Sequence, residues 1–307
     1  MTNVIEAVDL TKRYGSRRGI EAVDLAVAEG EVFGFLGPNG AGKTTTIRTL
    51  LGFLRPTAGR STVMGHDSWR DAAAAHVGVA YVSSDPAYLG QLTAAEQLDY
   101  MARLRGLSKG SWRIVAERLE LDTTVQVRKL SRGNRQKVGV VQAFMGEEPL
   151  LIMDEPTSGL DPLMQREFLT LVSEVRAAGR TVFLSSHNLP EVERACDHVG
   201  IIRAGRLVEV SSVSDLRASH WRSVSLELAA PPLDDLFDLP NVRVVSASAR
   251  DVHLMVQGDM NPLLRRLAGI EVGDISIATL EIEDVFLGYY DEPGVGGEAV
   301  TTEGARP

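Results

Sequence analysis

The residues best suited to chemistry lie between positions 37 and 45. They are Gly37, Pro38, Asn39, Gly40, Ala41, Gly42, Lys43, Thr44 and Thr45. This order fits the Gly-x4-Gly-Lys-Thr pattern of a phosphate-binding loop, whose backbone N–H groups surround a nucleotide polyphosphate. Glycine lets the backbone approach the phosphates without a Cβ, Lys43 supplies a cation, and the Thr44 hydroxyl is a ligand that magnesium accepts. The pattern predicts a nucleoside triphosphate site.

The segments on either side of the loop support this prediction. Residues 31–36 form a short apolar run suited to a buried strand, and Ile47, Leu50, Leu51 and Leu54 follow at helical spacing. The loop is therefore expected between a strand and the N-terminus of a helix, where the helix dipole favours an anion.

A second candidate lies at Asp154 and Glu155, which close the apolar run at residues 150–153. A buried strand would deliver these carboxylates to its C-terminal end, where open α/β sheets bind ligands. One carboxylate could then hold magnesium while the next orients water. An apolar run that ends in acidic residues is also common in structural strands, so the pattern alone leaves both interpretations open.

A third candidate is the segment Leu-Ser-Arg-Gly-Asn at residues 130–134, which opens a predicted helix. Basic residues in its first turns, Arg132 among them, oppose the helix dipole by about 0.3–1 kcal/mol each when exposed. A phosphate bound by Ser131 and the Gly133 amide would reverse that penalty. A solvated basic helix face fits the charges equally well.

Taken together, these segments resemble the ATP-binding subunit of an ABC transporter. The phosphate loop, residues 130–134, Asp154 with Glu155, the turn at residues 158–161 and the segment Ser-Ser-His at 185–187 follow one another in the family's order. They cover about the first two thirds of the chain. Arg132 and Asn134 stand where the family usually has glycine and glutamine. These departures, together with Ser84 in place of a usual glutamine, resemble the ABC-2 branch of bacterial exporters, which includes antibiotic-export systems.

The resemblance implies a role for each matching residue at the nucleotide. Lys43 and the loop amides would hold the β- and γ-phosphates of ATP. Thr44 and Asp154 would hold Mg²⁺. Glu155 would be the base that polarises the attacking water, and His187 would contact the γ-phosphate.

The resemblance also implies a second copy of the chain. Ser131 and Gly133 would contact the ATP held by the opposite subunit, so that a homodimer closes over the nucleotides. Tyr14 would stack on adenine, for which an aromatic face is well suited. Without the resemblance, we would interpret Tyr14 as a half-exposed strand residue.

The clearest departure from the family is Ser84, which stands where a glutamine usually reaches the metal and water. Serine is too short for that reach. Either water bridges the gap, Asp85 substitutes, or coupling to the membrane subunit runs differently. Ser84 and Asp85 are therefore the candidates for the loop that couples the site to the membrane subunit.

Composition limits the class of protein. The chain has 307 residues, 44% hydrophobic residues and a formal net charge of −9. An acidic chain argues against nonspecific nucleic-acid binding, which needs a basic surface. No apolar stretch approaches the ~18–20 residues of a membrane helix, and the start lacks signal-peptide character. We expect a cytoplasmic protein, peripheral on the inner face of the membrane through a separate permease. Cys196 is the only cysteine and is expected to pack rather than react.

The expected fold is α/β, a phosphate-loop NTPase of the ABC ATPase type. A mixed core sheet, an N-terminal antiparallel layer and a helical insert at about 71–146 would form an ATP-binding domain over 1–214. A small α+β domain would follow over 215–291, with a last helix at 281–290. The Gly-, Glu- and Thr-rich residues 292–307 are expected to be a disordered tail.

The leading functional prediction is an ATPase that dimerises on ATP and powers export of a small molecule or drug through its permease. The alternative is a regulatory or ribosome-associated ABC ATPase that is not coupled to transport. Ribosomal members usually carry tandem cassettes, and a single phosphate loop is present here. The resemblance does not identify the transported molecule, because selectivity belongs to the permease.

Overall fold

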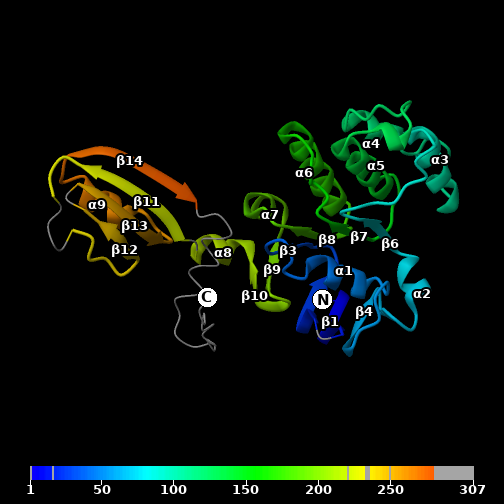
Figure 1. Ribbon diagram of the computed structural model, residues 1–307, viewed down its shortest axis with the longest axis horizontal. Coiled ribbons are helices and arrows are strands. Elements are labelled where there is room, and N and C mark those ends of the chain that lie inside the picture. The colour runs from blue at the N-terminus through cyan, green and yellow to red at the C-terminus, as the bar shows by residue number, and fades with distance from the viewer. Residues whose placement is uncertain (1, 16, 220, 232–235, 249, 280–307) are drawn as a thin grey trace, which may run out of the picture. The chain divides into compact units, whose positions relative to one another are not determined.

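The computed structural model describes residues 2–15, 17–219, 221–231, 236–248 and 250–279 (Figure 1). Contacts divide the chain into two compact units, residues 1–217 and 218–307. The division falls within helix α8 (Val213–Ser219), a few residues after the boundary expected at residue 214. Among the described residues, no helix is both long and apolar enough to cross a bilayer.

The first unit is built on a six-stranded sheet in the order β10-β9-β3-β8-β7-β6. Its strands are β3 (Val32–Leu36), β6 (Val79–Val82), β7 (Leu150–Asp154), β8 (Thr181–Ser186), β9 (His198–Arg203) and β10 (Arg206–Ser212). All neighbouring pairs are parallel except β9 and β10. Every residue of β3, β7 and β8 is buried, as expected for parallel strands covered on both faces.

A second, antiparallel sheet follows the order β2-β1-β4-β5. Its strands are β1 (Asn3–Tyr14), β2 (Arg17–Ala28), β4 (Ala58–Val63) and β5 (His66–Asp67). The apolar residues of β1 and β2 share one core cluster with Phe33, Phe35, Ile47 and Ile152. This layer, helix α1 (Lys43–Leu50) and the central sheet therefore pack as one body around the phosphate loop.

Helices complete the first unit. They are α1 (Lys43–Leu50), α2 (Ala72–His76), α3 (Ala94–Leu104), α4 (Arg113–Arg118), α5 (Arg132–Phe144), α6 (Pro162–Ala177) and α7 (Leu189–Ala195), with a 3₁₀ turn at Val127–Lys129. Thr93 and Glu96 form a capping box at the start of α3, which stabilises the first turn by pairing its free N–H groups.

The expected helical insert needs one correction. Strand β6 lies inside the span 71–146, yet it pairs in parallel with β7 and belongs to the central sheet. The reason is local: Ala80 and Val82 are buried at alternate positions, as in a strand that covers a core. The helical part of this span that follows β6 begins at α3.

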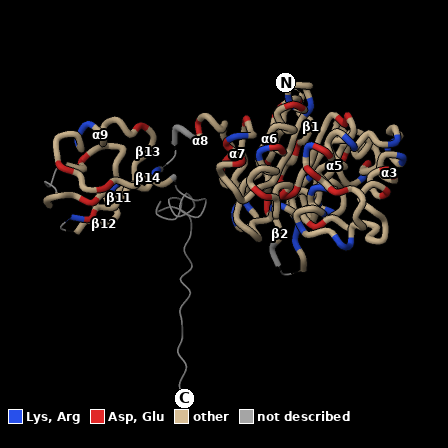
Figure 2. The backbone as a smooth tube through the Cα atoms, turned by 90° about the horizontal axis from the view of Figure 1, so that it is seen from above, with Lys and Arg blue, Asp and Glu red and all other residues tan. Residues whose placement is uncertain are grey.

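The second unit contains an antiparallel sheet in the order β12-β13-β11-β14. Its elements are β11 (Trp221–Leu228), β12 (Val242–Ala247), β13 (Asp251–Gln257), α9 (Asn261–Leu267) and β14 (Val272–Thr279). Its own core joins alternate residues of β11 and β13, such as Val224 and Leu254, to Leu263 of α9. Acidic and basic residues are interspersed along both units (Figure 2). The predicted helix at 281–290 and the tail at 292–307 lie outside the described residues.

Candidate active site

The phosphate loop joins β3 to α1, as predicted. Gly42 occupies the N-cap position of α1 with φ of 114°, and Gly40 has φ of 79°, a left-handed region that residues with a Cβ rarely adopt. A Cβ on Gly37 would lie 2.4 Å from the Ile202 carbonyl oxygen. The loop therefore needs glycine for its backbone path as well as for ligand access.

A cavity of about 530 Å³ opens beside this loop. Its lining residues are Tyr14, Gly19, Asn39, Gly40, Gly42, Lys43, Thr44, Thr45, Ser84, Arg132, Glu155, Ser158 and His187. Segments far apart in the sequence thus meet at one place. Within the described part of the chain, Gly37, Pro38, Ala41, Asp85, Ser131, Gly133 and Asp154 are not among the lining residues.

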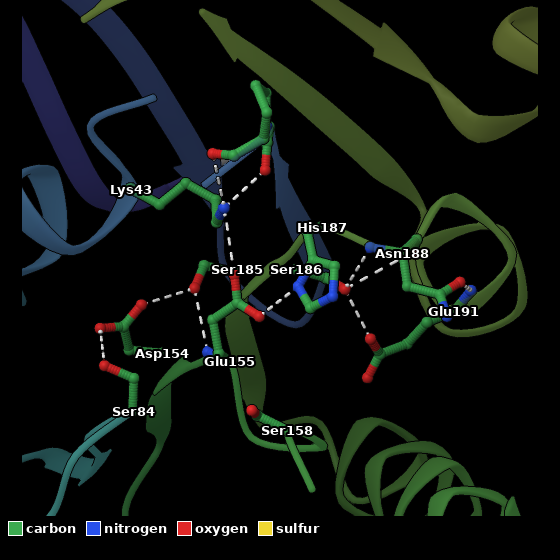
Figure 3. A network of polar contacts seen from close by, with 12 residues as sticks. Lys43, Ser84, Asp154, Glu155, Ser158, Ser185, Ser186, His187, Asn188 and Glu191 are labelled. Atoms are coloured by element: carbon green, nitrogen blue, oxygen red, sulfur yellow. Dashed lines mark hydrogen bonds and ion pairs between the residues drawn. The ribbon is translucent and has the colours of Figure 1, made fainter. Parts of the chain in front are cut away.

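Lys43 points across the cavity to a carboxylate (Figure 3). Its Nζ donates hydrogen bonds to the carbonyl oxygens of Gly37 at 2.5 Å and Pro38 at 3.1 Å. It also forms an ion pair with Glu155 Oε1 at 3.1 Å. The Lys43 side chain is 5% exposed, so its charge acts at short range with little screening by solvent.

Asp154, at the end of β7, is fully buried and surrounded by hydroxyl groups. Its Oδ2 accepts hydrogen bonds from Thr44 Oγ1 at 2.8 Å and Ser84 Oγ at 3.0 Å. Its Oδ1 accepts one from Ser185 Oγ at 2.8 Å. Hydroxyl and carboxylate oxygens from separate segments of the chain thus lie together, and oxygen atoms are the ligands that Mg²⁺ prefers.

Glu155 has an unusual backbone, with φ of 52° in a residue that is not glycine. Its N–H donates to the Ser185 carbonyl oxygen at 3.2 Å and to Ser185 Oγ at 3.1 Å, which holds this conformation in place. Its Oε2 lies 2.5 Å from His187 Nδ1. Backbone strain of this kind clusters at functional sites, and here it places one carboxylate between Lys43 and His187.

Of the remaining predicted residues, Tyr14 lines the cavity, whereas Ser131 and Gly133 do not. Tyr14 lines the cavity from β1, and the residue is 46% exposed. Ser131 is the exposed N-cap of α5, and its Oγ accepts a hydrogen bond from the Asn134 N–H at 3.2 Å. Gly133 packs so closely that a Cβ there would lie 2.3 Å from the Gly159 carbonyl oxygen. Ser131 and Gly133 therefore lie outside the cavity of their own chain.

Some lining residues were not predicted. Arg132 enters the cavity and its guanidinium lies 3.3 Å from Ser158 Oγ. Gly19 lines the cavity beside Tyr14, where a Cβ would lie 2.9 Å from the tyrosine ring. Ser185 does not line the cavity, but it holds Asp154, and the sequence shows it only as part of the segment 185–187. Its position one residue before the end of β8, next to β7, is the signal that relates it to Asp154.

The comparison with known proteins decides the family. Residues 20–158 match the family described as ABC transporter. The chain is 34% identical over 300 residues to the bacitracin transport ATP-binding protein BcrA of Bacillus licheniformis, covering 94% of this chain and 97% of that protein. This chain is an ATP-binding subunit of the ABC transporter family.

Further relatives of this ABC ATPase agree. It is 32% identical to the daunorubicin resistance ATP-binding protein DrrA3 of Streptomyces coeruleorubidus, over 90% of this chain and 92% of that one. A solved structure of an ATP-binding subunit of an ABC transporter superposes with a TM-score of 0.64 at 32% identity, covering 70% of this chain and 92% of that chain. The predicted family and fold class are confirmed, and the chain is an ATP-hydrolysing cassette.

Proposed function

We propose that this cassette binds ATP with Mg²⁺ in the 530 Å³ cavity, pairs with a second copy of itself, and powers export of an antibiotic or similar small molecule through a separate membrane permease. The observation that carries the proposal is the placement of Glu155 between Lys43 and His187, directly after the buried Asp154. The export direction is supported by relatives named for bacitracin transport, daunorubicin resistance and Nod factor export.

In this proposal the phosphate loop holds the substrate. The loop amides and Lys43 bind the β- and γ-phosphates, and the γ-phosphate takes over from Glu155 as the anionic partner of Lys43. Thr44 and Asp154 would hold Mg²⁺, which when bound neutralises phosphate charge. Ser84 supports this set through its hydrogen bond to Asp154. Tyr14 offers an exposed ring at the cavity for adenine.

Glu155 and His187 would act on the attacking water. Once Lys43 has turned to the phosphate, the Glu155 carboxylate is free to accept a proton from water beside the γ-phosphate. His187, hydrogen-bonded to the same carboxylate, would hold its orientation and contact the γ-phosphate. The 14% exposure of the Glu155 side chain limits competing contact with bulk solvent.

The proposed homodimer follows from Ser131 and Gly133, which lie outside the cavity of their own chain. The exposed N-terminus of α5, with the Ser131 hydroxyl, is available to the nucleotide of a second copy. The permease partner would place the protein at the inner face of the cell membrane, in the cytoplasm. The regulatory or ribosome-associated alternative is not favoured, because the relatives above are named for transport and drug resistance.

A cellular test uses the chain together with the membrane protein encoded beside it. Co-expression in a sensitive host should raise resistance to an antibiotic such as bacitracin or daunorubicin, the compounds for which the relatives are named, and the Lys43→Ala variant should not. Purified protein should hydrolyse ATP with Mg²⁺ and lose that activity in EDTA. Equal resistance from wild type and Lys43→Ala would contradict the export role, while absence of Mg²⁺-dependent hydrolysis would contradict the enzymatic one.

A further inference from the structure

Helix α7 carries a carboxyl group that the proposed mechanism does not use. Glu191 lies in the first turn of α7, four residues after His187 in the chain. The residue is partly exposed and lines a small cavity of about 150 Å³ with residues of α6 and α7. Its Oε1 atom, however, is buried and has no hydrogen bond of ordinary geometry among the described residues, although the Thr157 side chain is near enough to lower the pKa of this carboxyl. A buried carboxyl oxygen without a good hydrogen bond costs free energy, so its presence calls for an explanation.

The other carboxyl oxygen of Glu191 holds the segment that carries His187 (Figure 3). Ser186 Oγ donates a hydrogen bond to Glu191 Oε2 at 2.5 Å. The Asn188 N–H donates to the same Ser186 Oγ at 2.9 Å, and Asn188 Oδ1 accepts from the Glu191 N–H at 3.2 Å. Both neighbours of His187 in the chain are therefore tied to Glu191.

His187 itself has few restraints of its own. Its side chain is 53% exposed. Among the residues drawn in Figure 3, the hydrogen-bond partner of its ring is Glu155. An exposed side chain loses conformational freedom when it is held in one rotamer. The position of the imidazole therefore depends on how firmly the backbone of residues 186–188 is held.

The environment of the Glu191 carboxyl raises its pKa above the ordinary value for glutamate. Burial raises the pKa of Glu191, and the nearby negative charge of Glu155 raises it further. The Ser186 and Thr157 side chains and the charge of His187 act in the opposite direction but do not outweigh burial. Glutamine keeps an oxygen that can accept the hydrogen bond from Ser186 Oγ, so it retains the geometry on which the argument depends.

We propose that Glu191 is a positioning residue whose carboxyl, through Ser186 and Asn188, fixes the His187 ring against Glu155. This inference rests on the roles proposed above for Glu155 and His187. Glu191 is not among the residues that line the cavity of the phosphate loop. Its hydrogen bonds join it to Ser186 and Asn188 and not to the Glu155 carboxylate. It is expected to affect turnover without contributing to ATP binding.

Steady-state kinetics of the full chain provide the first test. Glu191→Ala removes the acceptor for Ser186, so kcat should fall by about tenfold to a hundredfold, as for other small misplacements of catalytic groups. The Kd for ATP should stay within about twofold, because the phosphate-loop contacts remain. Glu191→Gln keeps the acceptor and should stay within about threefold of wild-type kcat. Glu117→Gln, an exposed glutamate on α4, is the matched control.

A second measurement does not depend on hydrolysis. The imidazole resonances of His187 in the nucleotide-free protein, assigned with His187→Ala, report the ring's environment. They should shift in Glu191→Ala and remain unchanged in Glu191→Gln and Glu117→Gln. Ser186→Ala removes the same hydrogen bond and also the one from the Asn188 N–H to this hydroxyl. It should shift the resonances at least as much, and adding Glu191→Ala to it should lower kcat little further. If Glu191→Ala folds poorly, Ser186→Ala compared with Glu191→Gln still provides the test.

The outcomes separate this inference from the proposed function. Unchanged His187 resonances in both alanine variants, or a Glu191→Gln variant as slow as Glu191→Ala, would overturn the positioning role. A loss of ATP affinity in Glu191→Ala as large as its loss of kcat would also overturn the positioning role. If the resonances shift as expected but His187→Ala hydrolyses ATP at the wild-type rate, the positioning role stands and the proposed role of His187 fails.

Discussion

The Nζ atom of Lys43 lies 3.1 Å from Oε1 of Glu155, and both side chains are largely buried, at 5% and 14% exposure. The cation of the phosphate loop is thus already paired with the proposed catalytic carboxylate. A polyphosphate that enters the cavity must compete with this carboxylate for Lys43. When ATP binds, Lys43 therefore exchanges the Glu155 carboxylate for a phosphate, and Glu155 becomes free to act on water. Substitution of either residue tests this exchange.

The first prediction concerns the cation. Lys43→Ala leaves the polyphosphate without its fixed positive charge, and ATP affinity should fall by at least about tenfold, the scale of one charge-assisted contact. Fluorescent-nucleotide titration or calorimetry measures the change. Lys109→Ala, at an exposed position of the same charge, should leave the affinity as it is. Equal affinities for Lys43→Ala and wild type would refute the phosphate-loop assignment.

The second prediction concerns the carboxylate. Glu155→Gln removes the base but keeps the shape of the side chain, so hydrolysis should nearly cease while ATP still binds. Because the variant no longer offers Lys43 an anion, its Kd for ATP should also fall, by about three- to tenfold. With ATP and Mg²⁺ it should accumulate as a closed homodimer in size-exclusion chromatography. A wild-type rate of hydrolysis would exclude Glu155 as the base.

Much of this site follows from the order of segments in the sequence. The glycines of the phosphate loop and the apolar run before Asp154 each fix a strand end, and parallel strands bring those ends to one edge of the sheet. The strands of the second unit also follow from alternating apolar residues, such as Val252, Leu254 and Val256. Local pattern and fold agree at these positions.

Other features depend on tertiary contacts that spacing does not encode. β6 is too short for its alternation to show that it pairs with β7. The ion pair between Lys43 and Glu155 is a second example, because the sequence assigns Lys43 to the phosphates of ATP and Glu155 to the attacking water. The hydrogen bond between Ser84 and Asp154 depends on the register of β6 against β7, whereas the expectation from side-chain length concerns only the metal and the water.

The third prediction concerns the second unit. A chain that ends at Ser219 keeps α8, whose Val213 and Leu216 are buried, and it keeps every residue of the phosphate-loop cavity. Its affinity for ATP should equal that of the full chain, while homodimer formation or binding to the permease should weaken. Calorimetry and analytical ultracentrifugation would measure the two properties. A folded truncation without ATP affinity would contradict this division of roles.

The fourth prediction concerns the single cysteine. Cys196 is buried at the end of α7, and a Cβ on Gly34 would lie 2.9 Å from its Sγ. Burial raises the pKa of the Cys196 thiol well above its usual range, so the reactive thiolate is scarce. Iodoacetamide should leave the native protein unmodified at neutral pH and label it in urea. Ser108→Cys, at an exposed position, should add one site that reacts in the native state; rapid native labelling of wild type would contradict the packing role.

The last prediction returns to Ser84. Its hydroxyl is one of several donors to Asp154, and Thr44 and Ser185 would still hold that carboxylate after Ser84→Ala. Basal ATPase activity should therefore change only a few-fold, whereas loss of a direct magnesium ligand would cost far more. Thr44→Ala gives that comparison, and Asp85→Ala, at an exposed position outside the cavity, should be silent. If Ser84→Ala abolishes turnover as fully as Thr44→Ala does, Ser84 must act on the metal or the water itself. Its hydrogen bond to Asp154 would then be only the resting arrangement of a ligand.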